Sequence, residues 1–185
     1  VMGKGTGAAI LMATTRAVVR SANSAFAGGR FGATAATGEV LTEVNTILFD
    51  DLVASAAFVT GFFGWADPAT GQIRYVDAGH GLTLVVRADG SHQILPTTDL
   101  PLGVTADWTW TEHHLNLDPG DLLLCFSDGL FDLLGGTPEV FEVIADLARK
   151  HPRPPDLVKV IRSMATTAVP MDDVTVLVIR RSEVD

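Results

Sequence analysis

The sequence predicts an α+β fold with an antiparallel core, and two observations lead to that class. Through the first fifty residues, apolar side chains recur at spacings of three and four positions, which is typical of amphipathic helices. From Phe58 onward, short apolar or alternating runs are separated by Gly, Pro and Asp, which is typical of strands joined by tight turns. Helices and strands therefore fall into separate blocks, an order that favours α+β over alternating β and α units.

Helices are expected in the first block and again near the C-terminal end. The first pair covers residues 8–25 and 40–52, with Thr37 as a candidate N-cap of the second helix. A third covers residues 137–150, because the order Thr-Pro-Glu supplies an N-cap, a first-turn proline and an acidic side chain at the helix start. The fourth covers residues 152–167 and begins among three prolines.

Strands are expected between the helical blocks and at the end of the chain. Turn sequences at residues 67–71 and 88–90 separate consecutive apolar runs, as the loops of hairpins do. The Trp-Thr-Trp-Thr run alternates as a half-buried strand should, although its two indoles are better explained by core packing than by a ligand platform. The expected strands are residues 58–66, 72–76, 82–87, 92–95, 108–111, 121–126 and 174–179. Successive hairpins of this kind make an antiparallel sheet.

The composition is that of a compact domain with an acidic surface. The 185 residues are 47% apolar, enough for one sizeable core, so residues 1–185 are expected to form a single domain. A formal net charge of −9 argues against nucleic acid or an anionic membrane as a partner. The single cysteine, Cys125, excludes an intrachain disulfide and favours a reducing, cytoplasmic location. No run reaches the ~18 continuous apolar residues of a transmembrane helix.

Two acidic clusters stand beside strongly apolar runs near the C-terminal end. Ser127-Asp128-Gly129 follows the run at residues 122–126, and Asp172-Asp173 precedes the run at residues 174–179. If these runs are neighbouring antiparallel strands, the two clusters meet at one edge of a sheet. Clustered carboxylates repel one another unless a cation lies between them, and Mg²⁺ and Mn²⁺ prefer such oxygen ligands. The spacing therefore points to a metal-dependent hydrolase, although Asp-Gly and Asp-Asp are also common in solvated turns.

A series of motifs resembles the metal-dependent protein serine/threonine phosphatases, specifically the bacterial sporulation-stage-II-E branch that includes the sigma-B regulator phosphatases. The motifs occur in the family's order from the first residue nearly to the last. They are Val1-Met2-Gly3-Lys4-Gly5, Asp67-Pro68-Ala69-Thr70-Gly71, Tyr75-Val76-Asp77-Ala78-Gly79-His80, Pro101-Leu102-Gly103-Val104, Pro119-Gly120-Asp121, Ser127-Asp128-Gly129 and Asp172-Asp173-Val174-Thr175. The resemblance implies an antiparallel β-sandwich flanked by helices, with two Mn²⁺ or Mg²⁺ ions at one end.

The resemblance also implies which residues hold these ions. Asp128 and Asp172 become metal ligands and catalytic residues, and Asp173 is a weaker candidate beside them. The family has a bridging aspartate directly before its Val-x-Gly-Lys-Gly segment and uses the next backbone carbonyl as well. Here that carbonyl belongs to Val1, while the aspartate and the family's N-terminal strands lie outside the sequence. The expectation is an N-terminally truncated phosphatase domain, preceded by further strands and by a sensor or receiver domain.

The implied chemistry is hydrolysis of a phosphoserine or phosphothreonine ester by a metal-activated water, with no covalent phosphoenzyme. The implied substrate is a phosphorylated anti-sigma-factor antagonist or a similar phosphoprotein, and a homodimer is compatible with the family. A pseudophosphatase that serves as a partner-binding regulatory module is the alternative. His80 follows a strand and is open to two interpretations, a proton donor or water-orienting residue in the site and a loop histidine bonded to backbone.

Overall fold

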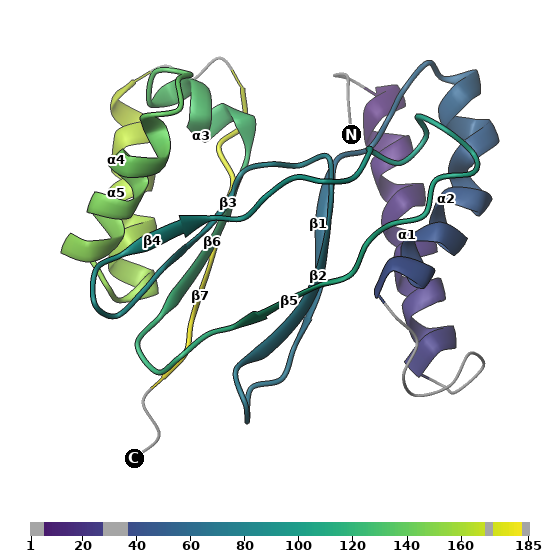
Figure 1. Ribbon diagram of the computed structural model, residues 1–185. Helices are drawn as coiled ribbons and strands as arrows, with labels where there is room; N and C mark the ends of the chain where they lie inside the picture. The colour runs from purple at the N-terminus through teal and green to yellow at the C-terminus, as the bar shows by residue number, and fades with distance from the viewer. Residues whose placement is uncertain (1–5, 28–36, 169–171, 183–185) are drawn as a thin grey trace. The chain divides into compact units, whose positions relative to one another are not determined.

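The computed structural model describes residues 6–27, 37–168 and 172–182, and Figure 1 shows their helices and strands. Helices come first, antiparallel strands follow, and two longer helices precede the last strand, so the predicted α+β class is confirmed. The chain divides into two compact units. The first is formed by residues 1–66, 73–80 and 97–115, and the second by residues 67–72, 81–96 and 116–185.

The first unit combines two helices with a small sheet. Helices α1 (Thr6–Ala27) and α2 (Thr37–Ala54) pack against each other. Strands β1 (Gly61–Ala66), β2 (Gln72–Ala78) and β5 (His113–Asn116) form a sheet in the order β1-β2-β5, in which β1 and β2 are antiparallel. The core of this unit consists of buried apolar side chains from both helices, from β2, from the segment before β1 and from the segment after β4: Leu11, Ala22, Val40, Leu41, Val44, Leu48, Leu52, Val59, Val76, Ala78, Leu102 and Trp110.

A buried asparagine attaches α2 to the loop that contains the Pro-Leu-Gly-Val motif. The side chain of Asn45 donates to the carbonyl of Thr105 at 3.0 Å and accepts the Gly103 N–H at 2.9 Å. Asn45 is fully buried, and these bonds satisfy the polar groups of its amide. In the same unit, Trp110 is buried and donates its indole N–H to the carbonyl of Leu100 at 2.9 Å.

The predicted strand at residues 108–111 is wrong, since that segment is irregular and β5 begins at His113. The indole of Trp108 donates to Asp99 at 3.3 Å, and the Thr111 N–H donates to the same carboxylate at 3.0 Å. The alternation of Trp and Thr therefore reflects two anchored indoles and not a sheet ladder. Core packing of Trp110, as expected from the sequence, is confirmed.

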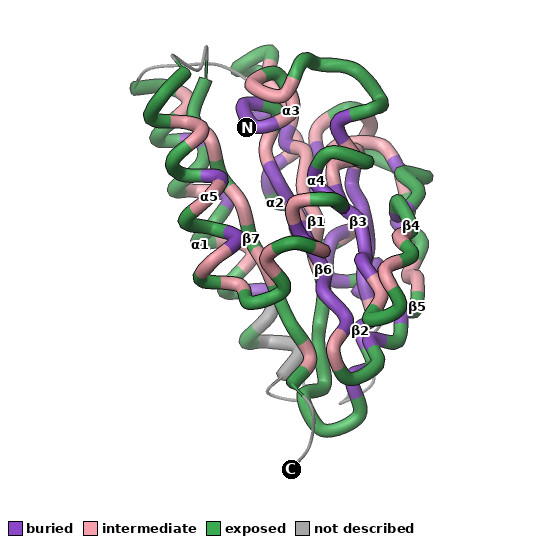
Figure 2. The backbone as a smooth tube through the Cα atoms, turned by 90° about the vertical axis from the view of Figure 1, so that its left-hand side faces the viewer, coloured by how far each residue is buried: buried purple, intermediate pink, exposed green. Residues whose placement is uncertain are grey.

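The second unit is a four-stranded sheet covered by helices. Strands β3 (Thr83–Val86), β4 (His92–Ile94), β6 (Leu122–Phe126) and β7 (Val176–Arg180) pair in the order β4-β3-β6-β7, and each pair is antiparallel. Every residue of β3 is buried, as Figure 2 shows by colour. The register of β6 against β7 places Leu122 opposite Arg180 and Phe126 opposite Val176.

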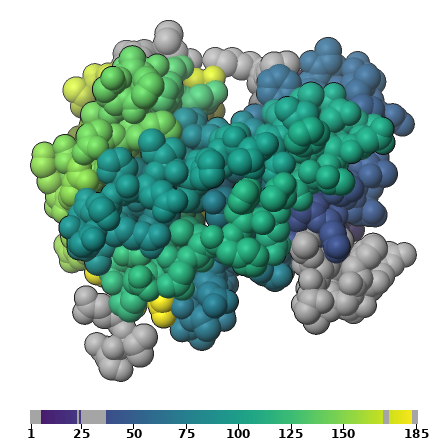
Figure 3. Space-filling view, in the orientation of Figure 1, coloured from purple at the N-terminus to yellow at the C-terminus, as the bar shows by residue number. Residues whose placement is uncertain are grey.

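Three helices belong to this unit: α3 (Asp128–Leu133), α4 (Val140–Lys150) and α5 (Pro154–Thr167). One face of the sheet packs with them in a single apolar cluster of Leu84, Val86, Leu122, Leu124, Phe126, Leu130, Val140, Ile144, Ala145, Ala148, Leu157 and Ile161. At the surface, the β3–β4 hairpin lies against α4 (Figure 3), where Arg149 donates to the Gly90 carbonyl at 2.9 Å.

Helix α3 was not expected from the sequence, and α4 begins three residues later than predicted. A turn precedes α4, in which the Val140 N–H donates to the Thr137 carbonyl at 3.0 Å. The expected segments at residues 1–5, the connection at residues 28–36 and the proline at position 170 lie outside the described residues.

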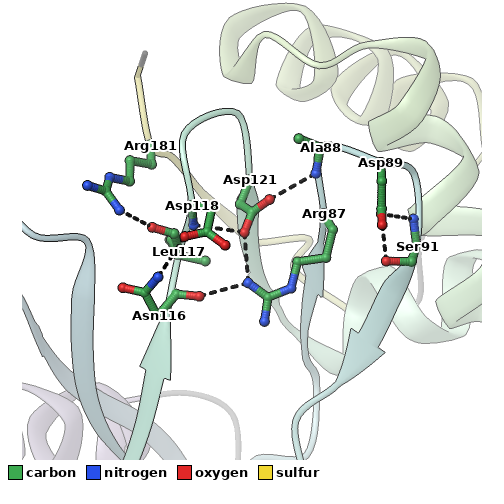
Figure 4. A network of polar contacts seen from close by, with 9 residues as sticks. All are labelled: Arg87, Ala88, Asp89, Ser91, Asn116, Leu117, Asp118, Asp121 and Arg181. Carbon is green, nitrogen blue, oxygen red and sulfur yellow. Dashed lines mark hydrogen bonds and ion pairs between the residues drawn. The ribbon is translucent and has the colours of Figure 1, made fainter. Parts of the chain in front are cut away.

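The Pro-Gly-Asp motif ends in a buried carboxylate that organises one end of the second unit (Figure 4). Asp121 accepts hydrogen bonds from the Arg87 guanidinium at 2.7 Å, the Ala88 N–H at 2.9 Å and the Asp118 N–H at 2.9 Å. Burial alone would raise the pKa of Asp121, but the bonds from Arg87, Asp118 and Ala88 outweigh it and lower the pKa below the usual value of 3.8. Nearby, Arg181 donates to the Leu117 carbonyl at 2.6 Å.

We expect Asp121→Asn to lower the free energy of unfolding by about 3 kcal/mol, because it leaves the Arg87 charge without its buried partner. Since the pKa is lowered in the folded protein, the contribution of Asp121 is present above pH 3.8 and is lost as the pH falls through the lowered pKa. Urea denaturation at pH 7 and at pH 3 measures both effects, and the difference between variant and wild type should shrink at the lower pH.

Asp89→Asn is the matched control for this prediction, because Asp89 is an exposed turn residue whose carboxylate accepts hydrogen bonds from the N–H and the hydroxyl of Ser91 (Figure 4). Its substitution should change stability by under about 1 kcal/mol. An Asp121→Asn protein as stable as the Asp89→Asn protein at pH 7 would show that the buried carboxylate does not stabilise the fold.

Candidate metal centre

The two acidic clusters lie at the same edge of the second unit's sheet. Strands β6 and β7 are neighbours and antiparallel, so the end of β6 meets the start of β7 at Phe126 and Val176. Asp128 comes two residues after β6, and Asp172 and Asp173 come shortly before β7. The arrangement expected from the two apolar runs is therefore confirmed.

Hydrogen bonds join the two acidic segments beyond the last ladder pair. The Ser127 N–H donates to the Thr175 carbonyl at 3.0 Å. The Ser127 hydroxyl accepts the Thr175 N–H at 2.9 Å and donates to the Asp173 carbonyl at 3.0 Å. Ser127 is thus the residue through which the segment carrying Asp128 is bonded to the segment before β7.

Close backbone contact also joins the two segments at Gly129. A Cβ atom at this position would lie 2.3 Å from the Asp173 carbonyl oxygen and 3.0 Å from that of Asp172. The shorter distance leaves no room for a side-chain carbon, so glycine permits this approach where another residue would force the backbone apart. In the sequence, Asp128-Gly129 indicates only a turn. The structure shows that the glycine allows the backbone of Asp173 to come close.

The three carboxylates of this edge are exposed to solvent. Asp128 accepts the Gly129 N–H at 2.9 Å, and Asp172 accepts the Asp173 N–H at 2.8 Å, so each carboxylate is oriented by the backbone next to it. Exposed carboxylate oxygens are the donors that Mg²⁺ and Mn²⁺ prefer, and the donor chemistry therefore fits such ions.

The ligand set within the described residues is incomplete. No group of three or more His, Cys, Asp or Glu side chains in residues 6–27, 37–168 and 172–182 could hold a metal ion. The backbone carbonyl of Val1, which is the other ligand expected in this chain, lies outside the described residues. Within the described residues, Asp128 and Asp172 could therefore form only part of the site that the sequence predicts.

His80 belongs to the first unit and follows β2. Its N–H donates to the Asp77 carboxylate at 2.6 Å, and Asp77 is fully buried. This bond makes Asp77 an organiser of the turn after β2, a role that the sequence pattern did not suggest. Gly79 in the same turn has a φ of 71°, a left-handed conformation that favours glycine.

Comparison with known proteins identifies the family. The family model described as Stage II sporulation protein E (SpoIIE) matches residues 1–182. The chain belongs to the SpoIIE family. A curated relative of this SpoIIE-family chain, Protein IcfG from Synechocystis, is 34% identical over 86 residues, which are 46% of this chain and 14% of that protein.

Solved structures share the fold of this SpoIIE-family chain. The RsbU and RsbW domains of Rv1364c from Mycobacterium tuberculosis align with a TM-score of 0.76 and 26% identity, over 98% of this chain and 50% of that one. The PP2C phosphatase domain of SpoIIE from Bacillus subtilis, with a fragment of its regulatory domain, aligns with a TM-score of 0.74 and 18% identity, over 97% and 52%. The chain therefore spans about half the length of these two solved chains.

A third solved structure is the catalytic domain of the serine threonine protein phosphatase PstP in complex with two manganese ions. It aligns with a TM-score of 0.62 and 16% identity, over 89% of this chain and 79% of that one. The chain thus belongs to the SpoIIE family and shares the fold of PP2C phosphatase domains. None of its described helices is long and apolar enough to span a membrane.

Proposed function

We propose that this domain hydrolyses phosphoserine or phosphothreonine on a regulatory protein, with two Mn²⁺ or Mg²⁺ ions bound at the edge where β6 ends and β7 begins. Asp128 and Asp172 would hold the ions, with Asp173 beside them and the carbonyl of Val1 as a further ligand. The observation that carries the proposal is the bonding of the two acidic segments through Ser127, together with the oxygen chemistry of the exposed carboxylates. Residues 1–185 would act as one phosphatase domain.

The ions and the residues at this edge would have different roles in the reaction. The bound ions would supply Lewis acidity toward the phosphoryl oxygens and would activate water. Asp128 and Asp172 are held by their own neighbouring N–H groups, which limits the rotation of both carboxylates. The close contact of Gly129 with the Asp172–Asp173 backbone fixes the separation of the two segments. A fixed separation matters because catalysis of phosphoryl transfer depends on positioning.

The regulatory role is supported by the domain composition of a related solved chain. The solved chain of Rv1364c, which aligns over 98% of this chain, contains an RsbU domain and an RsbW domain. Together with the resemblance to the sigma-B regulator phosphatases, this favours a phosphorylated anti-sigma-factor antagonist or a similar phosphoprotein as substrate in the cytoplasm. The net charge of −9 agrees with a protein substrate better than with nucleic acid.

Hydrolysis of p-nitrophenyl phosphate by the full-length protein that carries this chain tests the proposal. Turnover should require added MnCl₂ or MgCl₂ and should be abolished by EDTA. A phosphoserine-bearing antagonist protein should then be a substrate under the same conditions. If neither compound is hydrolysed and no metal binds, the incomplete ligand set of the described residues would instead favour a pseudophosphatase that acts as a partner-binding module.

A further inference from the structure

Ser127 lies where strand β6 passes directly into helix α3. Its backbone is extended, with φ −82° and ψ 163°. Its carbonyl oxygen accepts the N–H groups of Leu130 at 3.0 Å and Phe131 at 3.2 Å, and these bonds start α3. The carbonyl that would continue the sheet ladder toward β7 is therefore used by the helix.

The hydroxyl of Ser127 takes over the bond that the carbonyl does not make. In an antiparallel ladder, two opposed residues exchange a pair of N–H to carbonyl bonds. Here Ser127 donates its N–H to Thr175, but the return bond from the Thr175 N–H ends on the Ser127 hydroxyl at 2.9 Å. The side chain thus replaces a backbone carbonyl at Ser127. This allows α3 to begin at the next residue, Asp128.

The same hydroxyl makes a second bond, as a donor. It donates to the Asp173 carbonyl at 3.0 Å, so its proton and a lone pair are both engaged. Only a group that both donates and accepts can do this. Alanine would leave the Thr175 N–H and the Asp173 carbonyl without these partners, while threonine keeps both bonds possible.

From this geometry we infer that Ser127 is a positioning residue for the carboxylates of Asp128 and Asp172, and the inference rests on the proposed function. It would act through these two aspartates, because its own bonds go to the backbone of Asp173 and Thr175. Its hydroxyl holds the strand-to-helix turn that carries Asp128 against the segment that carries Asp172, so its removal should loosen the pair. Outer residues that orient metal ligands typically contribute 10–100-fold to metal affinity.

The test compares Ser127→Ala, Ser127→Cys and Ser127→Thr in the full-length protein, with Ser163→Ala as a matched control on the exposed face of α5. Calorimetric titration with Mn²⁺ gives the affinity, circular dichroism gives the fold, and p-nitrophenyl phosphate gives kcat and KM. We expect Ser127→Ala and Ser127→Cys to weaken Mn²⁺ binding about 10–100-fold and to lower kcat more than KM changes. Ser127→Thr should stay within a few-fold of wild type, and Ser163→Ala should be unchanged.

Wild-type Mn²⁺ affinity in a folded Ser127→Ala or Ser127→Cys protein would overturn the inference while the proposed function stood. Should Ser127→Ala fail to fold, the Cys and Thr variants decide, because Cys keeps the size of the side chain but hydrogen-bonds weakly. Equal loss of affinity in the Cys and Thr variants would also overturn the inference, since hydrogen bonding would then not be what matters. If the wild type binds no Mn²⁺ and hydrolyses nothing, the proposed function and the inference both fail.

Discussion

Asp128→Asn and Asp172→Asn are each expected to reduce metal-dependent turnover of p-nitrophenyl phosphate by at least about 10²-fold. Asparagine keeps the shape of the side chain but removes the negative charge that a hard dication needs. Metal ions stabilise charge on the reacting phosphoryl group by several kcal/mol, and each 1.36 kcal/mol is tenfold in rate. Because the two carboxylates lie at one sheet edge and the segments that carry them are hydrogen-bonded through Ser127, either loss should suffice.

Two further aspartates make the prediction specific. Asp132→Asn is the control, because Asp132 is exposed on α3 and carries no role in the proposed site. It should retain wild-type turnover. The turnover of Asp173→Asn should lie between that of Asp132→Asn and that of Asp128→Asn, since Asp173 lies beside the proposed ligands. Equal losses of turnover in the Asp128→Asn and Asp132→Asn proteins would mean that turnover depends on the total negative charge of this region. Asp128 would then not be a metal ligand.

Gly129→Ala is expected to lower turnover by roughly 10²-fold, the loss that follows from a displacement of about 1 Å in a catalytic group. Its added methyl group would lie 2.3 Å from the Asp173 carbonyl oxygen, so the segment carrying Asp172 must move away. Gly129 is in a helix, where alanine is intrinsically favoured by about 1 kcal/mol. A loss of activity therefore cannot come from helix propensity. Kinetics with Mn²⁺ measure the loss of turnover, and thermal denaturation without Mn²⁺ measures the change in stability.

Gly61→Ala provides the comparison for Gly129, because a Cβ atom there would meet nothing within 4 Å. That variant should keep both its activity and its melting temperature. Full activity in Gly129→Ala would show that the separation of the two acidic segments is not critical for catalysis.

Much of the fold follows from periodicity, because long amphipathic helices and apolar strands leave a strong pattern in the sequence. The helices α2 and α5 and the pairing of β6 with β7 were predictable for this reason. Helix α3 was not. It spans only residues 128–133, begins with an Asp-Gly pair that also signals a turn, and is held by tertiary contacts such as the fully buried side chain of Leu130.

Strand β5 shows the opposite error. Its sequence, His-His-Leu-Asn, carries little strand signal, whereas the Trp-Thr-Trp-Thr run just before it alternates strongly. The alternation comes from indoles that donate to Asp99 and to the Leu100 carbonyl. Periodicity of apolar residues does not reveal hydrogen bonds that side chains make to other segments of the chain.

The location of the candidate site was predictable from the sequence, but the contacts that hold its two segments together were not. Two aspartates beside two apolar runs indicate one sheet edge, and the register of β6 and β7 confirms it. The exchange of a backbone carbonyl for the Ser127 hydroxyl, and the backbone contact at Gly129, depend on which groups meet after folding. Nothing in the local sequence distinguishes such a serine or glycine from ordinary turn residues.

The most direct test of the central claim is a calorimetric titration of Mn²⁺ into the full-length protein and into its Asp128→Asn/Asp172→Asn variant. The account predicts saturable binding by the wild type and loss of that binding in the variant, with circular dichroism showing the same fold in both. Unchanged Mn²⁺ binding in the folded variant would contradict a metal centre at the edge where β6 ends and β7 begins.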